Sequence, residues 1–371
     1  MIIVNLTKKN ISFHMKIKIS LLYSLILLGS SVVIPMHLLA GEKAEITQKC
    51  PPTGIWCLLP SYSYKHPDQM DRLNNTPCWT NPNVDGIVLR ADWDKIEPTE
   101  SKIDFSYFDR GLELAKKYDK RIEILVPAGK HSPQWVYAAG AEKFTFHHHN
   151  GKPPDYMPIP WHPVLQEKFG NFIKKLGQRY DSSPYLSYVI MTGFGHSTEA
   201  WFAGPDDVDE YNAIGGNARW LEGAKWFAAL YNKAFPTTPF LIAMCPPSRD
   251  DEGRATLKKF VEDSVKDYPH RFGLKAASLE PNDKPDSRKL SYQSVNRFSD
   301  QTVVGFEMLR ATYKLKGTLK AALDTAIALK AQFVEVYEPD LIDPKQREVL
   351  AEASDKLKKN LTWNKEISEK L

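Results

Sequence analysis

The sequence lacks the features that identify several large classes of protein. It has four cysteines in 371 residues and no CxxC pair, which argues against a cysteine-ligated metal site. No GxGxxG or GxxxxGK[ST] segment occurs, so the glycine-rich turns that bind dinucleotides or nucleoside triphosphates are missing. No internal repeat or low-complexity segment stands out. What remains, with 42% hydrophobic and 25% charged residues, is typical of a globular protein with a sizeable core.

The first forty residues differ in character from the rest of the chain. Lys16 and Lys18 precede an apolar run at 19–39, and Ala40 offers a small residue for cleavage. This pattern predicts a secretory signal peptide over 1–40, with Met15 as an alternative start, and a mature domain over 41–371. We therefore expect a secreted or periplasmic protein. The alternative is an uncleaved anchor, and only in that case do we expect the protein to contact a membrane.

The apparent basicity of the chain belongs to this segment. Lys+Arg total 49 against 45 Asp+Glu, and residues 1–40 hold four lysines and no acids, so the remainder has 45 of each sign. A formally neutral chain gives no reason to expect a nucleic-acid partner. Export would permit disulfides, but the spacing of the four cysteines leaves all three pairings open.

Short apolar runs alternate with amphipathic stretches from about residue 54 onward. The runs predict strands at 54–59, 86–89, 122–127, 188–192, 240–244, 273–278, 303–306 and 333–337. Helical periodicity predicts helices at 105–118, 164–180, 218–234, 255–268, 318–330 and 344–359. Eight strands alternating with helices are the count of a single-domain (β/α)8 TIM barrel of the α/β class. A doubly wound open sheet is the main alternative.

Two glutamates carry the functional interpretation. Glu199 lies in the long connection after the fourth predicted strand, and Glu307 follows the apolar run of the seventh. Both would project over the C-terminal mouth of a barrel, where barrel enzymes keep their chemistry. A pair of carboxyl groups is the minimum equipment for breaking a glycosidic bond, because one donates a proton to the leaving oxygen while the other acts at the anomeric carbon. Glu335, which closes the eighth strand, is the reserve carboxylate.

Other side chains in the same connections suit the binding of an oligo- or polysaccharide. Aromatic rings stack on the apolar faces of sugars, and polar neighbours bind the hydroxyls. Arg90 ends the second strand, where its guanidinium could hold Glu307 ionised. Our candidate substrate-binding residues are Arg90, His131, Trp135, Trp161, His196, Trp201, Glu335 and Tyr337. We expect no metal or other cofactor, since the adjacent histidines 147–149 cannot all face one ion.

Residues 90–98 (Arg-Ala-Asp-Trp-Asp-Lys-Ile-Glu-Pro), 103–109 and 124–135 resemble clan A glycoside hydrolases, nearest the family 42 β-galactosidase-type catalytic barrel. The resemblance is strong over 84–190 and thin afterwards. It implies that Glu199 is the general acid/base, that Glu307 is the nucleophile, and that Arg90 lies beside the nucleophile.

The chain departs from this family at two points. Clan A enzymes have asparagine before the acid/base, and here the residue is Thr198. Residues 193–199 (Gly-Phe-Gly-His-Ser-Thr-Glu) instead resemble the strand-four loop of β-amylases, which are inverting barrels. Because the clan A resemblance covers more of the chain, we expect a retaining glycosidase in which apolar surroundings keep Glu199 protonated. The alternatives are an inverting enzyme, a carbohydrate-binding barrel that has lost hydrolysis, and a barrel of unrelated chemistry.

Overall fold

The computed structural model describes residues 49–59, 68–148 and 152–363. The segment expected to be a signal peptide lies outside these residues. Within the described residues, no helix is both long and apolar enough to span a bilayer.

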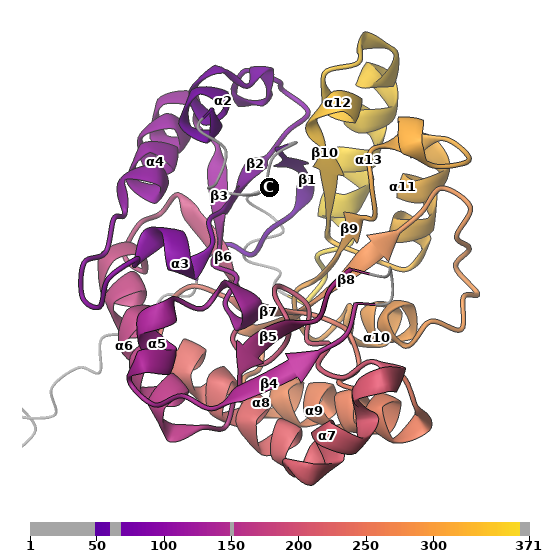
Figure 1. The fold of residues 1–371 in the computed structure, drawn as a ribbon. Coiled ribbons are helices and arrows are strands. Elements are labelled where there is room, and N and C mark those ends of the chain that lie inside the picture. The colour runs from indigo at the N-terminus through magenta and orange to yellow at the C-terminus, as the bar shows by residue number, and fades with distance from the viewer. Residues whose placement is uncertain (1–48, 60–67, 149–151, 364–371) are drawn as a thin grey trace, which may run out of the picture. The chain divides into compact units, whose positions relative to one another are not determined.

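Eight parallel strands close into a barrel, as the sequence predicts (Figure 1). In their order around the barrel after β1, the neighbours are β10, β9, β8, β7, β6, β3 and β2, and β2 closes on β1. The strands are β1 (Gly54–Leu58), β2 (Gly86–Arg90), β3 (Arg121–Leu125), β6 (Leu186–Met191), β7 (Phe240–Ala243), β8 (Phe272–Leu279), β9 (Val304–Met308) and β10 (Phe333–Tyr337). The fold class is therefore confirmed, and the open doubly wound sheet is excluded.

Helices surround the strands and cover their outer faces (Figure 1). Six correspond to predicted helices: α4 (Ser106–Tyr118), α6 (Pro163–Tyr180), α8 (Gly216–Ala234), α9 (Asp251–Asp267), α11 (Leu319–Ala328) and α13 (Arg347–Lys359). Unpredicted helices are α2 (Gln69–Asn75), α3 (Trp93–Ile96), α5 (Gln134–Ala138), α7 (Val208–Ala213), α10 (Leu290–Phe298) and α12 (Glu338–Leu341). Most of these are short, and too few apolar residues repeat in them to give a helical period.

The long connection after β3 contains a small hairpin that periodicity did not predict. Strands β4 (Lys143–Phe146) and β5 (Asp155–Pro158) pair antiparallel, and α5 precedes them. The Phe144 and Phe146 side chains are buried, and Phe144 packs on Phe202 of the connection after β6 with ring centroids 4.6 Å apart. The hairpin therefore ties the two long connections together at the carboxyl end of the barrel.

Alternation along the strands divides the core into two parts. Outward-facing side chains pack with the helices into one large cluster, while a second cluster fills the barrel itself and includes Trp56, Tyr188, Leu241 and Phe333. Gly305 faces the same interior, and a Cβ there would lie 2.3 Å from the Phe333 ring. A residue with no side chain on β9 therefore makes room for a large one on β10.

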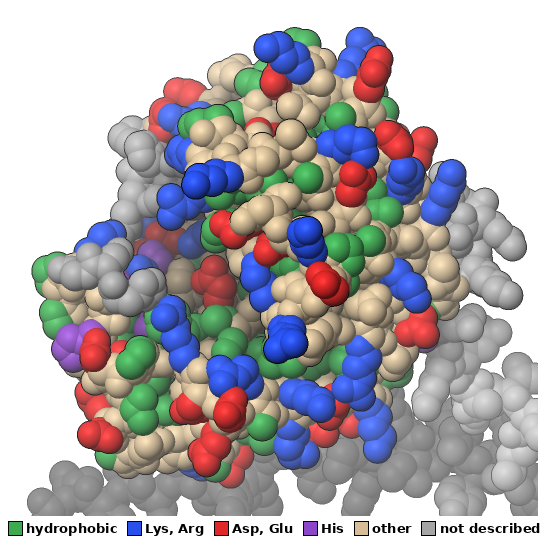
Figure 2. Space-filling model, turned by 90° about the vertical axis from the view of Figure 1, so that its right-hand side faces the viewer, with side chains coloured by type: hydrophobic (Ala, Val, Ile, Leu, Met, Phe, Trp, Pro, Cys, Tyr) green, Lys and Arg blue, Asp and Glu red, His purple; other side chains and the backbone are tan. Residues whose placement is uncertain are grey.

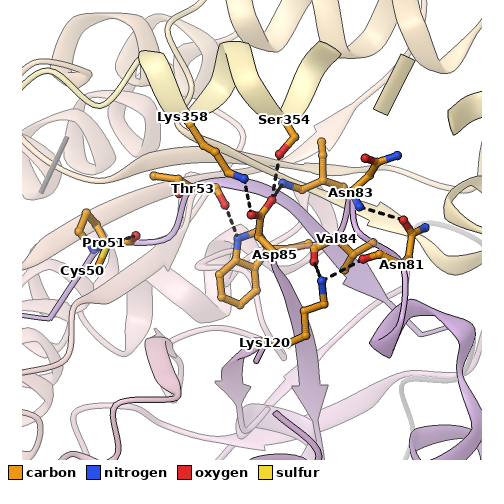
Figure 3. Close-up of polar contacts among 12 residues, drawn as sticks. Cys50, Pro51, Thr53, Asn81, Asn83, Val84, Asp85, Lys120, Ser354 and Lys358 are labelled. Atoms are coloured by element: carbon orange, nitrogen blue, oxygen red, sulfur yellow. Dashed lines mark hydrogen bonds and ion pairs between the residues drawn. The ribbon is translucent and has the colours of Figure 1, made fainter. Parts of the chain in front are cut away.

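A half-buried carboxylate, that of Asp85, holds several elements together at the amino-terminal end of the barrel (Figure 3). The Asp85 carboxylate accepts hydrogen bonds from the backbone N–H of Ile55 and from the hydroxyl of Ser354, both at 3.0 Å. Its other oxygen lies 2.6 Å from Nζ of Lys358, so α13 is held against the start of β1 and β2. Gly54 has φ +75°, and a Cβ on it would lie 2.0 Å from the Asp85 carboxylate.

We predict that Gly54→Ala destabilises the protein by about 3 kcal/mol, from a strained backbone of roughly 1–2 kcal/mol plus displacement of the Asp85 carboxylate. Gly140→Ala is the matched control, because Gly140 has φ +103° but no atom lies within 4 Å of the position that a Cβ would take there. Urea denaturation of both variants would measure the difference. Equal midpoints would mean that the Asp85 contact adds nothing.

Candidate active site

The candidate site lies at the carboxyl end of the barrel, where β9 and β10 bring two predicted residues side by side. Glu307 on β9 is in register with Glu335 on β10. Glu199 reaches the same end by another route, since its backbone forms a parallel bridge with Ala243, the last residue of β7. The connection after β6 therefore runs on as a short extension beside β7.

A buried lysine that the sequence did not predict as part of the site, Lys275, contacts the carboxyl groups of both Glu307 and Glu335. Lys275 on β8 is 1% exposed, and its Nζ lies 2.9 Å from the Glu335 carboxylate and 3.1 Å from that of Glu307. Glu123 on β3, also not predicted, is fully buried at 3.7 Å from the same nitrogen. Neither oxygen of Glu123 has a hydrogen-bond partner in the described part of the chain. The barrel interior thus holds one ammonium and three carboxyl groups.

Burial, together with the neighbouring charges, determines how Glu307 and Glu335 titrate. Burial raises the pKa of Glu307 to about 7, opposed by the ammonium of Lys275 and reinforced by Glu335 and Glu199. Burial likewise raises the pKa of Glu335 to about 8, with a further upward contribution from Glu123. For Lys275 burial acts downward, but the three surrounding carboxylates outweigh it and the net change in pKa is upward.

Glu199 and Glu307 lie at the same end of the barrel, and the charge of Glu199 contributes to the raised pKa of Glu307. The negative charge of Glu199 acts on both Glu307 and the thiol of Cys245, whose pKa burial raises to about 12. Glu199 is exposed, and its Oε2 accepts a hydrogen bond from the Thr198 hydroxyl at 2.8 Å. The apolar surroundings that we expected for Glu199 are therefore wrong, because its loop holds it at the surface.

Glu335 takes a different role from the substrate contact expected of it. Its side chain is 0% exposed, and its oxygens are engaged by Lys275 and by the hydroxyl of Tyr188 at 3.0 Å. A sugar cannot reach a carboxylate in this position. Glu335 instead lies beside Glu307 in the sheet and shares the Lys275 ammonium with it.

Arg90 does not contact Glu307 in the way that we expected. Among the described residues the ion-pair partner of Glu307 is Lys275. The Arg90 guanidinium instead lies 3.4 Å from the hydroxyl of Ser197, two residues before Glu199. Arg90 therefore belongs to the mouth but is directed toward the connection that carries Glu199.

His131 forms a pair of its own near the end of β3. Its Nδ1 lies 3.1 Å from the Asp92 carboxylate. Within the described part of the chain, Asp92, Asp94 and His131 are the group whose ligand atoms come close enough for a metal ion, all within 4.8 Å of one another. The His131–Asp92 pair accounts for that proximity without an ion, so we assign no metal to it.

The aromatic candidates and His196 mostly build the walls of the site. His196 stacks on Phe146 at 3.7 Å, its Nε2 contacts the Phe202 carbonyl, and burial lowers its pKa to about 4. Trp161 stacks on Phe202 at 5.4 Å, and the guanidinium of Arg249 lies 4.6 Å from the Trp201 ring. These side chains fix the connections that carry Glu199.

Trp135 and Tyr337 each line a separate surface pocket. The Trp135 indole donates to the Glu97 carbonyl at 2.9 Å and lines a pocket with Glu97, Lys168 and Lys175. No candidate carboxylate of the pair lines that pocket. Tyr337, the last residue of β10, lines a cleft with Leu309, which lies two residues beyond Glu307. Neither Glu199 nor Glu307 lines this cleft, so the two aromatic residues differ only in that Tyr337 lies at the end of a strand next to Glu307 in the sheet.

A cavity of about 370 Å³ lies at the opposite end of the barrel, lined by Trp56, Asp85, Lys120 and Arg121 among others. The amino-terminal end of a (β/α)8 barrel serves stability, whereas chemistry occurs at the carboxyl end. Its polar groups are largely engaged in closing the barrel, as Figure 3 shows for Asp85 and Lys120. We therefore place the candidate chemistry at the mouth that holds Glu199 and Glu307.

The closed parallel barrel is a (β/α)8 fold, and Glu199 and Glu307 both lie at its carboxyl end. Residues 87–193 match the family model of glycoside hydrolase family 42, described as beta-galactosidase. The resemblance expected over residues 84–190 is therefore confirmed, and it supports a glycoside hydrolase.

Solved structures of glycoside hydrolases share the fold at low sequence identity. The catalytic domain of the beta-amylase from Paenibacillus polymyxa aligns with a TM-score of 0.56 at 10% identity, over 82% of this chain and 99% of that one. The beta-galactosidase from Rahnella sp. R3 aligns at 0.54 and 12% identity, over 85% of this chain and 57% of that one. The beta-galactosidase from Marinomonas ef1 aligns with a TM-score of 0.51 at 8% identity, over 82% of this chain and 59% of that one. The chain thus spans less than two thirds of each galactosidase.

We predict that Lys275→Met lowers the free energy of unfolding by about 3–5 kcal/mol at pH 8, because buried carboxylates lose their counterion. The loss should be smaller at pH 5. The raised pKa values of Glu307 and Glu335 mean that the folded state binds their protons more tightly than the unfolded state. That stabilisation is present below about pH 5 and disappears as the pH rises through about 7 and 8.

Urea denaturation at several pH values would measure this effect. Lys258→Met, on the exposed face of α9, is the control and should leave the midpoint unchanged. A loss for Lys275→Met that is the same at pH 5 and pH 8 would contradict the electrostatic explanation.

Proposed function

We propose that this protein is an exported glycoside hydrolase that cleaves O-glycosidic bonds with Glu199 and Glu307. The observation that carries the proposal is that Glu307 on β9 and Glu199, whose backbone is bridged to the last residue of β7, both lie at the carboxyl end of the barrel. Glycoside hydrolysis requires two carboxyl groups that flank the glycosidic bond. The apolar run and small residue within 1–40 support export.

We infer a retaining reaction as the first candidate. Glu199, at the exposed edge, donates a proton to the glycosidic oxygen while the Glu307 carboxylate attacks the anomeric carbon, and the leaving alcohol departs. Glu199 then takes a proton from water, and the resulting hydroxide displaces Glu307 from the glycosyl ester and releases the sugar. Lys275, 3.1 Å from Glu307, supports the ionised form that this attack requires.

An inverting reaction is the second candidate, and the raised pKa of Glu307 favours it. A carboxyl group with a pKa of about 7 is half protonated at neutral pH, which suits a proton donor or a base better than a resting nucleophile. In this case water attacks the anomeric carbon directly and no glycosyl ester forms.

A barrel that binds carbohydrate without cleaving it is the third candidate. Thr198 stands where clan A enzymes have asparagine, and its hydroxyl donates to Glu199 instead of facing outward to a ligand. Binding of a glycan by wild-type protein with no product release over long incubation would favour this candidate over hydrolysis.

Replacing either carboxyl group by its amide should lower turnover without unfolding the protein. We expect Glu199→Gln and Glu307→Gln to lose roughly 10²–10⁴-fold in kcat, because each removes a proton donor or a nucleophile. Release of nitrophenol or reducing sugar from a panel of glycosides would measure the loss. Glu210→Gln, in exposed α7, is the control and should retain full activity.

Chemical rescue separates the roles of the two residues. In the retaining reaction, azide should restore activity to Glu307→Ala and give a glycosyl azide of inverted anomeric configuration, whereas Glu199→Ala should give the retained configuration. Wild-type turnover in both amide variants would rule out this pair.

The pH profile tests the ionisation of Glu307. If Glu307 is the nucleophile, kcat/KM should rise with pH through about 7, since the carboxyl group must first lose its proton. Lys275→Met removes the ammonium that lowers this pKa, so its rising limb should move to higher pH. A profile that falls through pH 7 would instead identify Glu307 as the proton donor.

A further inference from the structure

The cleft that Tyr337 lines with Leu309 begins two residues beyond Glu307 along the chain. Alternation along β9 puts Val303 and Glu307 on the interior face, and Leu309 is the next residue on that face. Along β10 the same alternation runs from Phe333 through Glu335 to Tyr337. Leu309 and Tyr337 therefore each lie two residues beyond a glutamate of the barrel, the partly exposed Glu307 and the buried Glu335.

An aromatic ring stands open to solvent in this cleft. Tyr313 is 70% exposed and Leu309 is 39% exposed, and in the described part of the chain only Ile342 joins them as a large exposed hydrophobic residue. The cleft has a volume of about 320 Å³, within the range of small-ligand sites. An exposed tyrosine beside a cleft of this size is suited to stacking on the face of a sugar.

Hydrogen bonds fix the backbone of the segment that carries Tyr313. The buried Asp340 accepts a hydrogen bond from the backbone N–H of Thr312 at 2.9 Å and another from its hydroxyl. The hydroxyl of Tyr337 donates to the carbonyl of Leu309 at 3.4 Å. Both contacts join the segment after β9 to β10 and α12.

The charges around the cleft are positive. Arg310 and Lys314 line it together with Leu309, Ala311, Tyr313, Tyr337 and Pro339, and no acidic side chain is among the seven. The Lys314 ammonium lies 5.2 Å from the Tyr313 ring. The nearest acids on neighbouring elements, Asp340 and Glu338, are engaged by Thr312 and Thr76. Figure 2 shows Lys and Arg side chains interspersed with Asp and Glu side chains over the face that it displays.

We propose that this cleft is a subsite for an anionic sugar unit, one that carries a carboxylate or a sulfate, adjacent to the bond that is cleaved. Tyr313 stacks on the ring of that unit, and Arg310 and Lys314 bind its acidic group. The inference rests on the proposed function for the adjacency of a cleaved bond, but the binding itself requires no hydrolysis. It narrows the substrate from carbohydrate in general to acidic glycans.

Affinity electrophoresis through gels containing polygalacturonate, dextran sulfate or a neutral galactan tests the subsite. The protein should be retained by an anionic polymer more strongly than by the neutral one. Arg310→Ala/Lys314→Ala and Tyr313→Ala should each weaken that retention about tenfold. Retention should also fall as salt rises from about 50 to about 300 mM, since exposed charges are screened. Lys258→Ala/Lys259→Ala on α9 removes the same charge elsewhere and is the matched control.

The two polymers distinguish the acidic group. Retention by polygalacturonate alone identifies a carboxylate, by dextran sulfate alone a sulfate, and by both a site that accepts either. Equal retention by the neutral galactan, or equal losses in the cleft variant and the α9 control, would overturn the subsite. So would an unchanged Tyr313→Ala, because binding would then depend on charge alone.

Running the same gels with Glu307→Gln keeps this result separate from the proposed function. Anionic retention with unchanged hydrolysis in the amide variants would refute the catalytic pair and leave the subsite standing. Loss of hydrolysis in the amide variants, without any preference for the anionic polymers, would support the catalytic pair and refute the subsite.

Discussion

The contact between one buried ammonium and three carboxyl groups is the constraint on which the rest of the barrel depends. Lys275 lies within 4 Å of Glu123, Glu307 and Glu335 inside a closed ring of strands. Burial and the excess of negative charge make Glu307 and Glu335 keep their protons to a higher pH than glutamates in water. A barrel interior filled only with apolar side chains would be easier to stabilise, which suggests that this arrangement is retained for its effect on Glu307.

The proposed chemistry is a consequence of position along the strands. Glu335 and Glu307 are in register, yet Glu335 is closed off by Tyr188 and Lys275 while Glu307 is 22% exposed. Glu307 therefore has one side in the low-dielectric interior, where its pKa is tuned, and one side in the mouth, where a substrate can reach it. Glu199 comes from a connection and not from a strand, and this gives it the exposure that a proton donor to a departing alcohol needs.

The aromatic residues divide into two groups by what their rings contact. Trp161 and Phe144 pack on Phe202, and Phe146 stacks on His196. These contacts join the connections after β3 and β6 and so fix the position of Glu199. Tyr313 has its face open to solvent beside two cations. A ring that is already covered cannot stack on a sugar, and this physical difference separates wall from candidate subsite.

The barrel could be predicted from the amino-acid sequence, which also led us to propose Glu199 and Glu307 as a catalytic pair. Buried parallel strands are continuous apolar runs, and the alternation of eight such runs with amphipathic helices is visible without coordinates. An acid at the end of such a run, as in Glu307, stands out for the same reason.

Which charged side chains meet inside the barrel depends on how the sheet closes. Lys275 and Glu123 lie within strands whose local pattern is ordinary, and their partnership joins β3 to β8 across the interior through side chains far apart in sequence. The same holds for Arg90, which meets Ser197 instead of Glu307, and for the exposure of Glu199. Local pattern records which residues face inward, but the pairing of charges and the dielectric around them arise only when the sheet closes.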